Sequence, residues 1–368
     1  MTTLRVRAAA STSIVRIDRG ALARTGRLAR SAGLEPGPCA VVSDRRVARL
    51  YGRALERSLR AAGFHPITRV IVPPGERSKS LARVAALYEA FARAGLERGR
   101  PVFALGGGVV GDLAGFAAAT WLRGVPLVMV PTSLLAQVDS SVGGKVGVDL
   151  PRGKNLVGAF HQPRLVVIDP DVLATLPARH VRAGLAEAAK VGWALDAPLA
   201  RLLERTADAA LAGDSSALLA VIGRAVRAKA RVVSADERDR GARQLLNYGH
   251  TAGHALEALG GYRTWIHGEA VALGMAIAAR LAVRRGLLSA ADADRQVELL
   301  ARLGFPPAAR ALRRVSARKL WNAMQLDKKR SAGSLRFVLT ERMGVASFGH
   351  RVGRAEVIAA LQDAGCNP

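Results

Sequence analysis

Three of the chain's seven histidines stand in one short stretch, at a spacing that suits a metal ion or a substrate. His250 and His254 are four residues apart, so on a helix their imidazoles lie on the same face. His267 follows the pair Gly260-Gly261, where the chain can turn back toward the first two histidines. Two histidines so spaced on an alanine-rich helix are more often packed or solvated than bound to a metal. The third histidine, the nearby glycines and a glutamate upstream favour the metal.

A glycine-rich turn, residues 106–112, follows the apolar run Pro101–Leu105 and matches the pattern G-x-G-x-x-G. Between a strand and a helix, such glycines let the backbone approach a pyrophosphate, and the helix N-terminus supplies amide donors. In a chain with 38 glycines the pattern alone is weak, and a plain strand-to-helix turn is the alternative. Asp44, at the end of an earlier strand, could bind a ribose hydroxyl. It precedes the glycines, so the arrangement is not the ordinary Rossmann one.

Two Gly-Lys pairs, at Lys145 and Lys154, stand beside serine and asparagine side chains, as in loops that cradle anions. Neither has the spacing of a P-loop, and a solvated loop is an equally good interpretation of either pair alone. Farther along, Glu187 and Lys190 are three residues apart on an expected helix. A weak surface ion pair is the default interpretation of that spacing.

With 368 residues, half of them hydrophobic, the chain is long enough for two domains with sizeable cores. No run of about 18 uncharged apolar residues predicts a membrane span, and Met1 leads into no signal-like segment. Cys39 and Cys366 are too few for a disulfide framework and favour a reducing, cytoplasmic setting.

The net charge of +26 raises the question of whether the chain binds nucleic acid. The basic residues are scattered and mixed with acids, without a basic arm, so we expect no nucleic-acid partner. Of the 55 basic residues eight are lysines, most of them inside the glycine-rich or polar motifs. A lysine retained in an arginine-rich chain can indicate that its position requires a compact ammonium group. The positive charge also fits a small anionic substrate.

Short apolar runs alternate with amphipathic ones over roughly the first 170 residues, which is typical of a parallel sheet with crossover helices. Beyond Leu176-Pro177 the sequence turns to long Ala/Leu/Arg helices. We therefore expect an α/β, Rossmann-like N-terminal domain over residues 1–177 and a mainly α-helical domain over residues 178–368. The expected strands are residues 40–43, 70–72, 101–105, 126–130, 165–168 and 335–339, and the first expected helices are residues 47–62 and 81–94.

Laid end to end, these motifs resemble those of the 3-dehydroquinate synthase family, within the sugar phosphate cyclase superfamily. The resemblance runs from about Asp44 to about Leu339, in long stretches that keep the same order. They are PGERSKS, ALGGGVVGDLAGFAAATWLRG, VPTSLLAQVDSSVGGKVGVDLPRGKNLVGAFHQP, TLP, GLAEAAK, DERDRGARQLLNYGHTAGHALE and WIHGEAVALGM. The resemblance implies an NAD-binding α/β domain, a helical metal-binding domain and a homodimer.

Position by position, the resemblance implies one divalent ion, Zn²⁺ or Co²⁺, held by Glu187, His250 and His267. One carboxylate with two imidazoles suits a catalytic zinc whose coordination stays open for substrate oxygens. His254 then corresponds to a substrate-contacting histidine and not to a ligand. The implied NAD contacts are Asp44, Glu76, Lys79, Gly107, Gly108, Val109, Asp112, Thr132, Ser133, Asp139, Lys145, Lys154 and Thr175.

The implied substrate carries a carboxylate and a phosphate, which explains several cationic side chains in one site. Its contacts would be Arg123, Asp139, Lys145, Lys154, Asn155, Lys190, Lys229, Arg243, Asn247, His254 and one of Lys328 and Lys329. Catalytic roles would fall to Lys145, Lys190, Lys229, Arg243, Asn247 and His254. Arg123 would reach the phosphate pocket of the partner subunit.

The reaction implied by the resemblance converts 3-deoxy-D-arabino-heptulosonate 7-phosphate to 3-dehydroquinate and phosphate, in the shikimate pathway. NAD takes a hydride from C5 and later returns it; phosphate is eliminated in between, and an intramolecular aldol step closes the new ring.

Two alternative functions stay open at this point. A different sugar phosphate cyclase, acting on an amino analogue or on sedoheptulose 7-phosphate, would look similar, although Lys229 and Asn247 are of the dehydroquinate type. An NAD- and metal-dependent polyol dehydrogenase would release NADH and would not need Lys145, Lys154 and Arg243.

Overall fold

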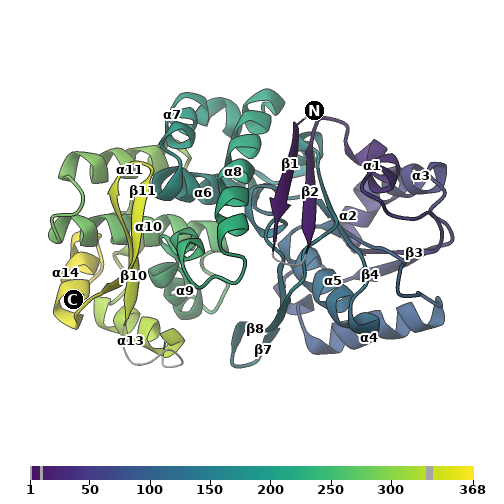
Figure 1. Cartoon of the computed structure of the whole chain (residues 1–368). Helices are drawn as coiled ribbons and strands as arrows, with labels where there is room; N and C mark the ends of the chain where they lie inside the picture. The colour runs from purple at the N-terminus through teal and green to yellow at the C-terminus, as the bar shows by residue number, and fades with distance from the viewer. Residues whose placement is uncertain (1, 9–10, 329–334) are drawn as a thin grey trace. The chain divides into compact units, whose positions relative to one another are not determined.

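The structure, a computed structural model, describes residues 2–8, 11–328 and 335–368, without the side chains of residues 326–328. The chain divides into two compact units. Unit 1 comprises Met1–Leu176 and Lys229–Arg238, and unit 2 comprises Pro177–Ala228 and Asp239–Pro368. Helix α8 (Ser215–Ala235) therefore contributes its last turns to unit 1 (Figure 1). The assignment of separate functions to residues 1–177 and 178–368 stays a prediction.

Unit 1 is built on a seven-stranded sheet in the order β1-β2-β9-β6-β5-β3-β4. Neighbouring strands are parallel throughout, except for the antiparallel pair β1 and β2. The strands are β1 (Thr2–Arg7), β2 (Thr12–Ile17), β3 (Cys39–Asp44), β4 (Ile67–Val72), β5 (Val102–Gly106), β6 (Leu127–Pro131) and β9 (Leu165–Ile168). The Rossmann-like parallel sheet predicted from the apolar runs is confirmed, and the β1-β2 hairpin is an addition at its edge.

Helices cover both faces of this sheet, which explains why its inner strands are continuous apolar runs. On one face α1 (Thr25–Ser31) and α3 (Arg53–Ala61) join a core that includes Phe103 and Val128. On the other face α5 (Gly108–Thr120) lies close to β6, where a side chain on Gly111 would contact Met129. Helix α4 (Leu81–Arg93) packs beside α5. The expected helix over residues 47–62 is interrupted by a wider turn at Ala48–Gly52.

The strand order reverses at β3, which predicts a ligand site at the carboxyl edge of the sheet. From β3 the chain adds β4 on one side and then crosses to β5 on the other side of β3. In open α/β sheets, ligands bind where the strand order reverses in this way. Asp44 ends β3, Gly107 follows β5 and Thr132 follows β6, so three of the expected NAD contacts lie along this one edge.

Both Gly-Lys pairs lie on an antiparallel hairpin that the sequence analysis did not predict, formed by β7 (Lys145–Leu150) and β8 (Gly153–Phe160) (Figure 1). The two strands approach closely at Gly147 and Gly158, which face each other; a Cβ on Gly147 would stand 2.7 Å from Val157 O. Both lysines therefore lie on a hairpin and not in a loop, although Lys145 is exposed as in the solvated interpretation.

Unit 2 is mainly helical, as expected. Its helices are α6 (Ala178–Leu195), α7 (Ala197–Leu211), the first part of α8, α9 (His250–Leu259), α10 (His267–Arg284), α11 (Ala290–Arg302), α12 (Ala308–Leu312), α13 (Ala317–Lys328) and α14 (Arg354–Asp363). The expected strand near residues 335–339 is β10 (Arg336–Arg342), which pairs with β11 (Val345–Arg351). Helix α10 is buried around most of its circumference, because its small residues let α6, α9, α11 and α14 pack onto it. Among the described residues, no helix has the length and apolar character needed to span a membrane.

Candidate active site

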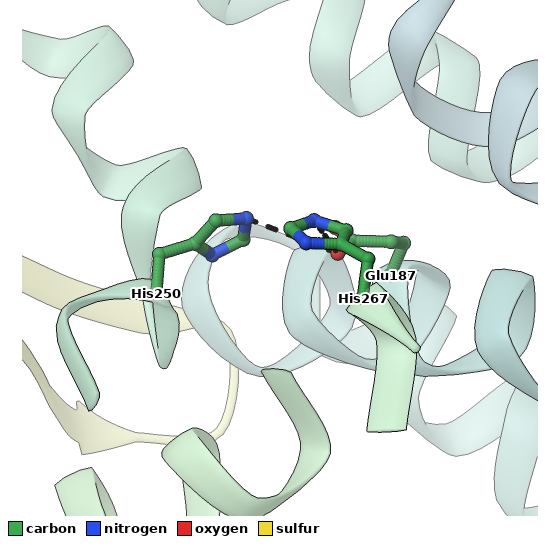
Figure 2. Close-up of side chains that lie close together, drawn as sticks. All are labelled: Glu187, His250 and His267. Carbon is green, nitrogen blue, oxygen red and sulfur yellow. Dashed lines mark ion pairs between the residues drawn. The ribbon is translucent and has the colours of Figure 1, made fainter. Parts of the chain in front are cut away.

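Three helices of unit 2 bring Glu187, His250 and His267 together. Glu187 lies in the middle of α6, while His250 and His267 are the first residues of α9 and α10. Figure 2 shows the three side chains pointing toward one another. Nε2 of His267 is 3.3 Å and Nε2 of His250 is 3.8 Å from Oε1 of Glu187. One ligand atom from each residue lies within 4.8 Å of the others, a spacing that one tetrahedral metal ion could bridge.

Glycines at the helix crossings allow this approach. A Cβ on Gly274 of α10 would overlap the carbonyl oxygen of Gly249, which precedes α9, and a Cβ on Gly268 would overlap the backbone of Ala183 in α6. Gly249 also has a φ of 77°, which other residues rarely adopt. Larger residues at these crossings would separate the three helices and therefore the three ligands.

The donor set fits a cation. Glu187 is fully buried, and neither of its oxygens accepts a hydrogen bond of good geometry from the described residues. Lys190 Nζ is 2.6 Å from Oε2, an electrostatic contact whose angles fall short of a hydrogen bond. A buried carboxylate in this condition is costly unless a cation binds it. A divalent ion held by one carboxylate and two imidazoles would satisfy it.

The ionisation of the group also suits metal binding. Burial raises the pKa of Glu187, but Lys190, His250 and His267 reverse the effect and hold the pKa well below its usual value. Burial, with Lys190, lowers the pKa of His250 to about 3, so this imidazole is neutral, as a ligand must be. Burial lowers the pKa of His267, yet its contacts with Glu187 and Glu257 raise it to about 10. Metal binding would displace the proton that His267 holds.

The outer nitrogen of each histidine has its own partner. Nδ1 of His250 is 3.1 Å from the carbonyl oxygen of Tyr248, and Nδ1 of His267 is 3.1 Å from Oε2 of Glu257. Both Nε2 atoms are thereby left to face Glu187. Sequence analysis did not identify Glu257; the available signal was its place seven residues after His250, about two helical turns along the same helix.

Lys190 and His254 also lie at this group. The surface ion pair predicted for Glu187 and Lys190 is wrong, because their side chains are 0% and 1% exposed. Helix α6 packs against α7 and α10, so both residues point into the unit. The ring centre of exposed His254 is 5.3 Å from that of His250 and 6.0 Å from that of His267.

The remaining predicted residues of unit 2 precede α9 or follow α12. Arg243 is buried and Asn247 half-buried, both in the short helix Ala242–Asn247. Lys328 is the last residue of α13, and Lys329 lies outside the described residues.

In unit 1, the glycine-rich turn has the predicted context between a strand and a helix. Strand β5 ends at Gly106, and Gly107 is the N-cap of α5. A Cβ on Gly106 would stand 2.5 Å from Cβ of Val110, so a side chain does not fit there. Gly107, Gly108 and Val109 are half-buried at the start of the helix, where free backbone amides can meet a pyrophosphate.

A charged network lies beside this turn. Lys79 is 4% exposed, and its Nζ is 2.8 Å from Asp112 Oδ2 and 3.7 Å from Glu76 Oε1. Lys154 Nζ is 3.5 Å from the same Glu76 oxygen. Asp149, which the sequence analysis did not identify, lies 3.8 Å from Lys79 and accepts a hydrogen bond from the backbone of Asn155. Four of the predicted NAD contacts therefore do lie together.

Burial and these neighbours shift the pKa values of the network. Burial lowers the pKa of Lys79, but Asp112, Glu76 and Asp149 outweigh it, so the pKa is raised. Burial raises the pKa of Asp112, which Lys79 only partly offsets. The network is held together by opposite charges in a partly buried place, and shifted pKa values of this kind are common at binding sites.

Lys229 and Asp139 form a second pair of predicted residues in unit 1. Lys229 is 6% exposed; its Nζ donates to the backbone carbonyl of Asp139 at 2.6 Å and to its carboxylate at 2.5 Å. Asp139 lies in the short helix Ala136–Ser140, after the buried Thr132 and the half-buried Ser133.

Five other predicted residues are occupied by structural contacts or exposed. Asp44 caps the short helix Arg45–Val47 through two backbone amides. The hydroxyl of Thr175 is 2.6 Å from that of Tyr51. Arg123 is exposed, with a φ of 66°, and makes no ion pair with any described residue. The exposed Lys145 and Asn155 lie on the β7-β8 hairpin.

Comparisons with known proteins agree with the motifs. The family model described as 3-dehydroquinate synthase N-terminal matches residues 69–183, and the C-terminal model of the same synthase matches residues 184–330. The 3-dehydroquinate synthase of Pelobacter propionicus is 49% identical over 328 residues, which are 89% of this chain and 90% of the relative.

Two solved structures are similar in fold and sequence. The 2-epi-5-epi-valiolone synthase of Streptomyces hygroscopicus subsp. jinggangensis, with NAD⁺ and Zn²⁺ bound, has a TM-score of 0.86 and 31% identity, covering 95% of this chain and 96% of that one. A 2-deoxy-scyllo-inosose synthase complexed with carbaglucose-6-phosphate, NAD⁺ and Co²⁺ has a TM-score of 0.85 and 26% identity, covering 98% and 99%. Because both family models match in order and the sequence relative covers most of the chain, this chain belongs to the 3-dehydroquinate synthase family.

Proposed function

We propose that the chain converts 3-deoxy-D-arabino-heptulosonate 7-phosphate to 3-dehydroquinate and phosphate, as a phosphate-eliminating carbon–oxygen lyase. The observation that carries the proposal is the group formed by buried Glu187 and half-buried His250 and His267, with Lys190 beside it, in a chain of this family. The identity of 49% to a 3-dehydroquinate synthase, against 31% and 26% to cyclases of other names, supports this substrate over its analogues.

Glu187, His250 and His267 would hold one divalent ion, Zn²⁺ or Co²⁺. Such an ion supplies Lewis-acid polarisation of substrate oxygens and lowers the pKa of a bound hydroxyl. Lys190 neutralises one carboxylate charge in the buried group and presents an ammonium donor beside it. His254, exposed at the rim of the group, is placed to hold or move a proton on a substrate oxygen.

The glycine-rich edge of unit 1 would hold NAD, which would supply reversible hydride transfer at C5 of the substrate. Gly107, Gly108 and Val109 would present backbone amides to the pyrophosphate. The Lys79–Asp112 contact fixes the start of α5 against the segment that carries Glu76, so the turn keeps its shape. The remaining residues proposed to contact NAD are Asp44, Glu76, Thr132, Ser133, Asp139, Lys145, Lys154 and Thr175.

The anionic groups of the substrate would be bound by cationic side chains and amides. Arg243 offers a planar fork that suits a carboxylate or a phosphate, whereas the lysines offer compact ammonium groups. Asp139 orients Lys229 through two short contacts, so this ammonium is held in one place. The proposed substrate contacts are Asp139, Lys145, Lys154, Asn155, Lys190, Lys229, Arg243, Asn247, His254 and one of Lys328 and Lys329.

A homodimer in the cytoplasm is proposed as the working form. Arg123 is exposed on a backbone of positive φ and pairs with no described carboxylate of its own chain, which suits a role in the partner's phosphate pocket. Cys39 and Cys366 are both free and buried, as in proteins of reducing compartments.

The test is an assay of phosphate release from the heptulosonate phosphate, with NAD present and with or without a chelator. Phosphate should accumulate while the absorbance of reduced nicotinamide stays flat, because the hydride returns to its carbon. The chelator should stop the reaction, and added Zn²⁺ should restore it. Accumulation of NADH in step with product would favour a polyol dehydrogenase and reject the proposal.

A further inference from the structure

We propose that Glu257, which is not one of the three metal ligands, orients His267 for metal binding and adds its own negative charge to the metal site. The inference rests on the proposed metal site. Glu257 belongs to α9, as His250 does, so one helix would supply both a ligand and the residue that positions another ligand. Its side chain is 4% exposed and is directed at His267 of α10.

The two nitrogens of His267 face two different carboxylates. Nδ1 is 3.1 Å from Glu257 Oε2, and Nε2 is 3.3 Å from Glu187 Oε1. A neutral imidazole has one N–H and one lone pair, and the position of the proton follows from its hydrogen-bond partner. Donation of Nδ1–H to Glu257 would leave the lone pair of Nε2 for a metal ion and would fix the rotation of the ring.

The charge of Glu257 also matters, because the group is shielded from water. Glu187, Lys190 and Glu257 have side chains that are 0%, 1% and 4% exposed. Lys190 offsets one carboxylate, so once His267 has given up its proton the second carboxylate leaves the group with a net negative charge that favours a dication. Attraction between charges is strong in such a poorly solvated interior. Without Glu257, the carboxylate of Glu187 alone would have to offset the repulsion between Lys190 and the bound dication.

His250 provides an internal contrast. Its Nδ1 lies 3.1 Å from the carbonyl oxygen of Tyr248, a neutral acceptor held by the backbone. The ring of Tyr248 is fixed in turn, because its hydroxyl donates to Gln296 Oε1 at 2.9 Å. His250 is therefore held by a neutral backbone carbonyl and His267 by an anionic side chain. Because a side chain can be removed by substitution, the role of Glu257 can be tested directly.

A direct role of Glu257 as a ligand is the competing interpretation. Glu257, His254 and His267 form a second group whose ligand atoms also lie within 4.8 Å of one another. If His267 bound two ions at once, however, it would have to lose both ring protons, which a neutral imidazole resists. A positioning role needs no such loss.

The experiment measures Zn²⁺ affinity by chelator competition on metal-stripped wild type, Glu257→Ala and Glu257→Gln, and records the visible spectrum of each Co²⁺ form. Glu257→Ala should weaken binding about 10- to 100-fold and alter the Co²⁺ spectrum. Glu257→Gln keeps an acceptor for Nδ1–H but removes the charge, so it should show a smaller loss and a spectrum close to that of wild type.

Asp196→Ala is the matched control. Asp196 is another buried carboxylate of unit 2, which caps α7 and lies 2.7 Å from Arg224. Its loss should lower the melting temperature without changing Zn²⁺ affinity, which separates general destabilisation from an effect on the ligands.

Three results would overturn the inference. Zn²⁺ affinity of Glu257→Ala within about twofold of wild type would remove the positioning role. Two equivalents of Zn²⁺ in wild type and one in both Glu257 variants would make Glu257 a ligand. Wild type that binds no Zn²⁺ would reject the metal site itself, and this outcome alone also counts against the proposed function.

Discussion

The buried group of unit 2 and the charged network of unit 1 have similar side chains but different access to water. In unit 2, Glu187, Lys190 and Glu257 are almost entirely buried. In unit 1, Lys79 is equally buried, but the side chain of Asp112 is 19% exposed and that of Glu76 is 41% exposed. Water can therefore stabilise the carboxylates of unit 1, whereas those of unit 2 need a cation. We therefore expect unit 1 to keep its shape without a ligand and unit 2 to need a metal for completion.

His250→Ala should have the largest effect, since it removes a ligand from the group that depends on a cation. We expect metal content to fall to background and turnover to be abolished. Elemental analysis and the phosphate-release assay measure the two quantities. His350→Ala, which changes a histidine of the β10-β11 hairpin, is the control and should keep both. One tightly bound zinc per chain in His250→Ala would show that the ligand assignment is wrong.

Removal of the metal from wild type should destabilise the protein strongly. At a free metal concentration about 1,000 times the dissociation constant, binding contributes about 4 kcal/mol to the free energy of unfolding. A chelator should therefore lower the melting temperature of wild type. The same treatment should leave His250→Ala unchanged, because that variant has no metal to lose. An equal effect of the chelator on both proteins would contradict the comparison.

Lys79→Met tests the network of unit 1. It leaves Asp112 without its nearest cation, and we expect a loss of about 3 kcal/mol in the free energy of unfolding. The raised pKa of Lys79 means that its contribution is complete below about pH 10.4, the usual lysine value, and is lost as the pH rises through the raised value. Denaturant unfolding from about pH 10 upward should show the onset of this loss in wild type but not in Lys79→Met.

A control variant and a measurement of bound zinc accompany the prediction for Lys79→Met. Lys319→Met changes an exposed lysine of α13 and should be nearly silent. Bound zinc should be retained in Lys79→Met, because the ligands belong to the other unit. Loss of zinc in that variant would show that the two regions are not as independent as the comparison states.

Lys→Arg substitutions should have smaller effects that follow burial. Lys190 and Lys229 are 1% and 6% exposed, so the larger guanidinium group should cost at least about 10-fold in kcat/KM, about 1.4 kcal/mol. Lys154 and the exposed Lys145 have more room, and we expect their losses to be smaller. The zinc content should stay normal in all four variants. Equal effects at Lys145 and Lys190 would mean that burial is not the deciding factor.

The smallest effect is expected from Arg93→Lys, the reverse exchange at an exposed position of α4. Surface substitutions of this kind usually change stability by less than about 0.5 kcal/mol. A loss of activity there would remove the argument that the few lysines of this chain are special.

The sequence predicted those features that depend on local patterns. Strands β3, β5, β6 and β9 were predictable because buried parallel strands are continuous apolar runs. The turn after Gly106 was predictable because its glycines stand between such a strand and a helix. The family motifs pointed to Glu187, His250 and His267, and the structure does bring their side chains together.

The features that sequence analysis missed depend on contacts between distant segments. The spacing of Glu187 and Lys190 gave no sign of burial, which results from the packing of α7 and α10 on α6. The partner of His267 at Glu257 depends on how α9 crosses α10, and the glycines that set this crossing face each other only in the folded unit. The β7-β8 hairpin turns at Pro151-Arg152, which lack the Asn-Gly or Asp-Gly signal of a short hairpin.

The central claim is that one metal ion at Glu187, His250 and His267 is required for phosphate elimination. The most direct test titrates metal-stripped wild type with Zn²⁺ in the presence of NAD and the heptulosonate phosphate, while phosphate release is measured. Activity should begin at background, rise in proportion to added Zn²⁺ and level off at one equivalent per chain. Full activity before any metal is added, or a rise that continues to two equivalents, would contradict the account.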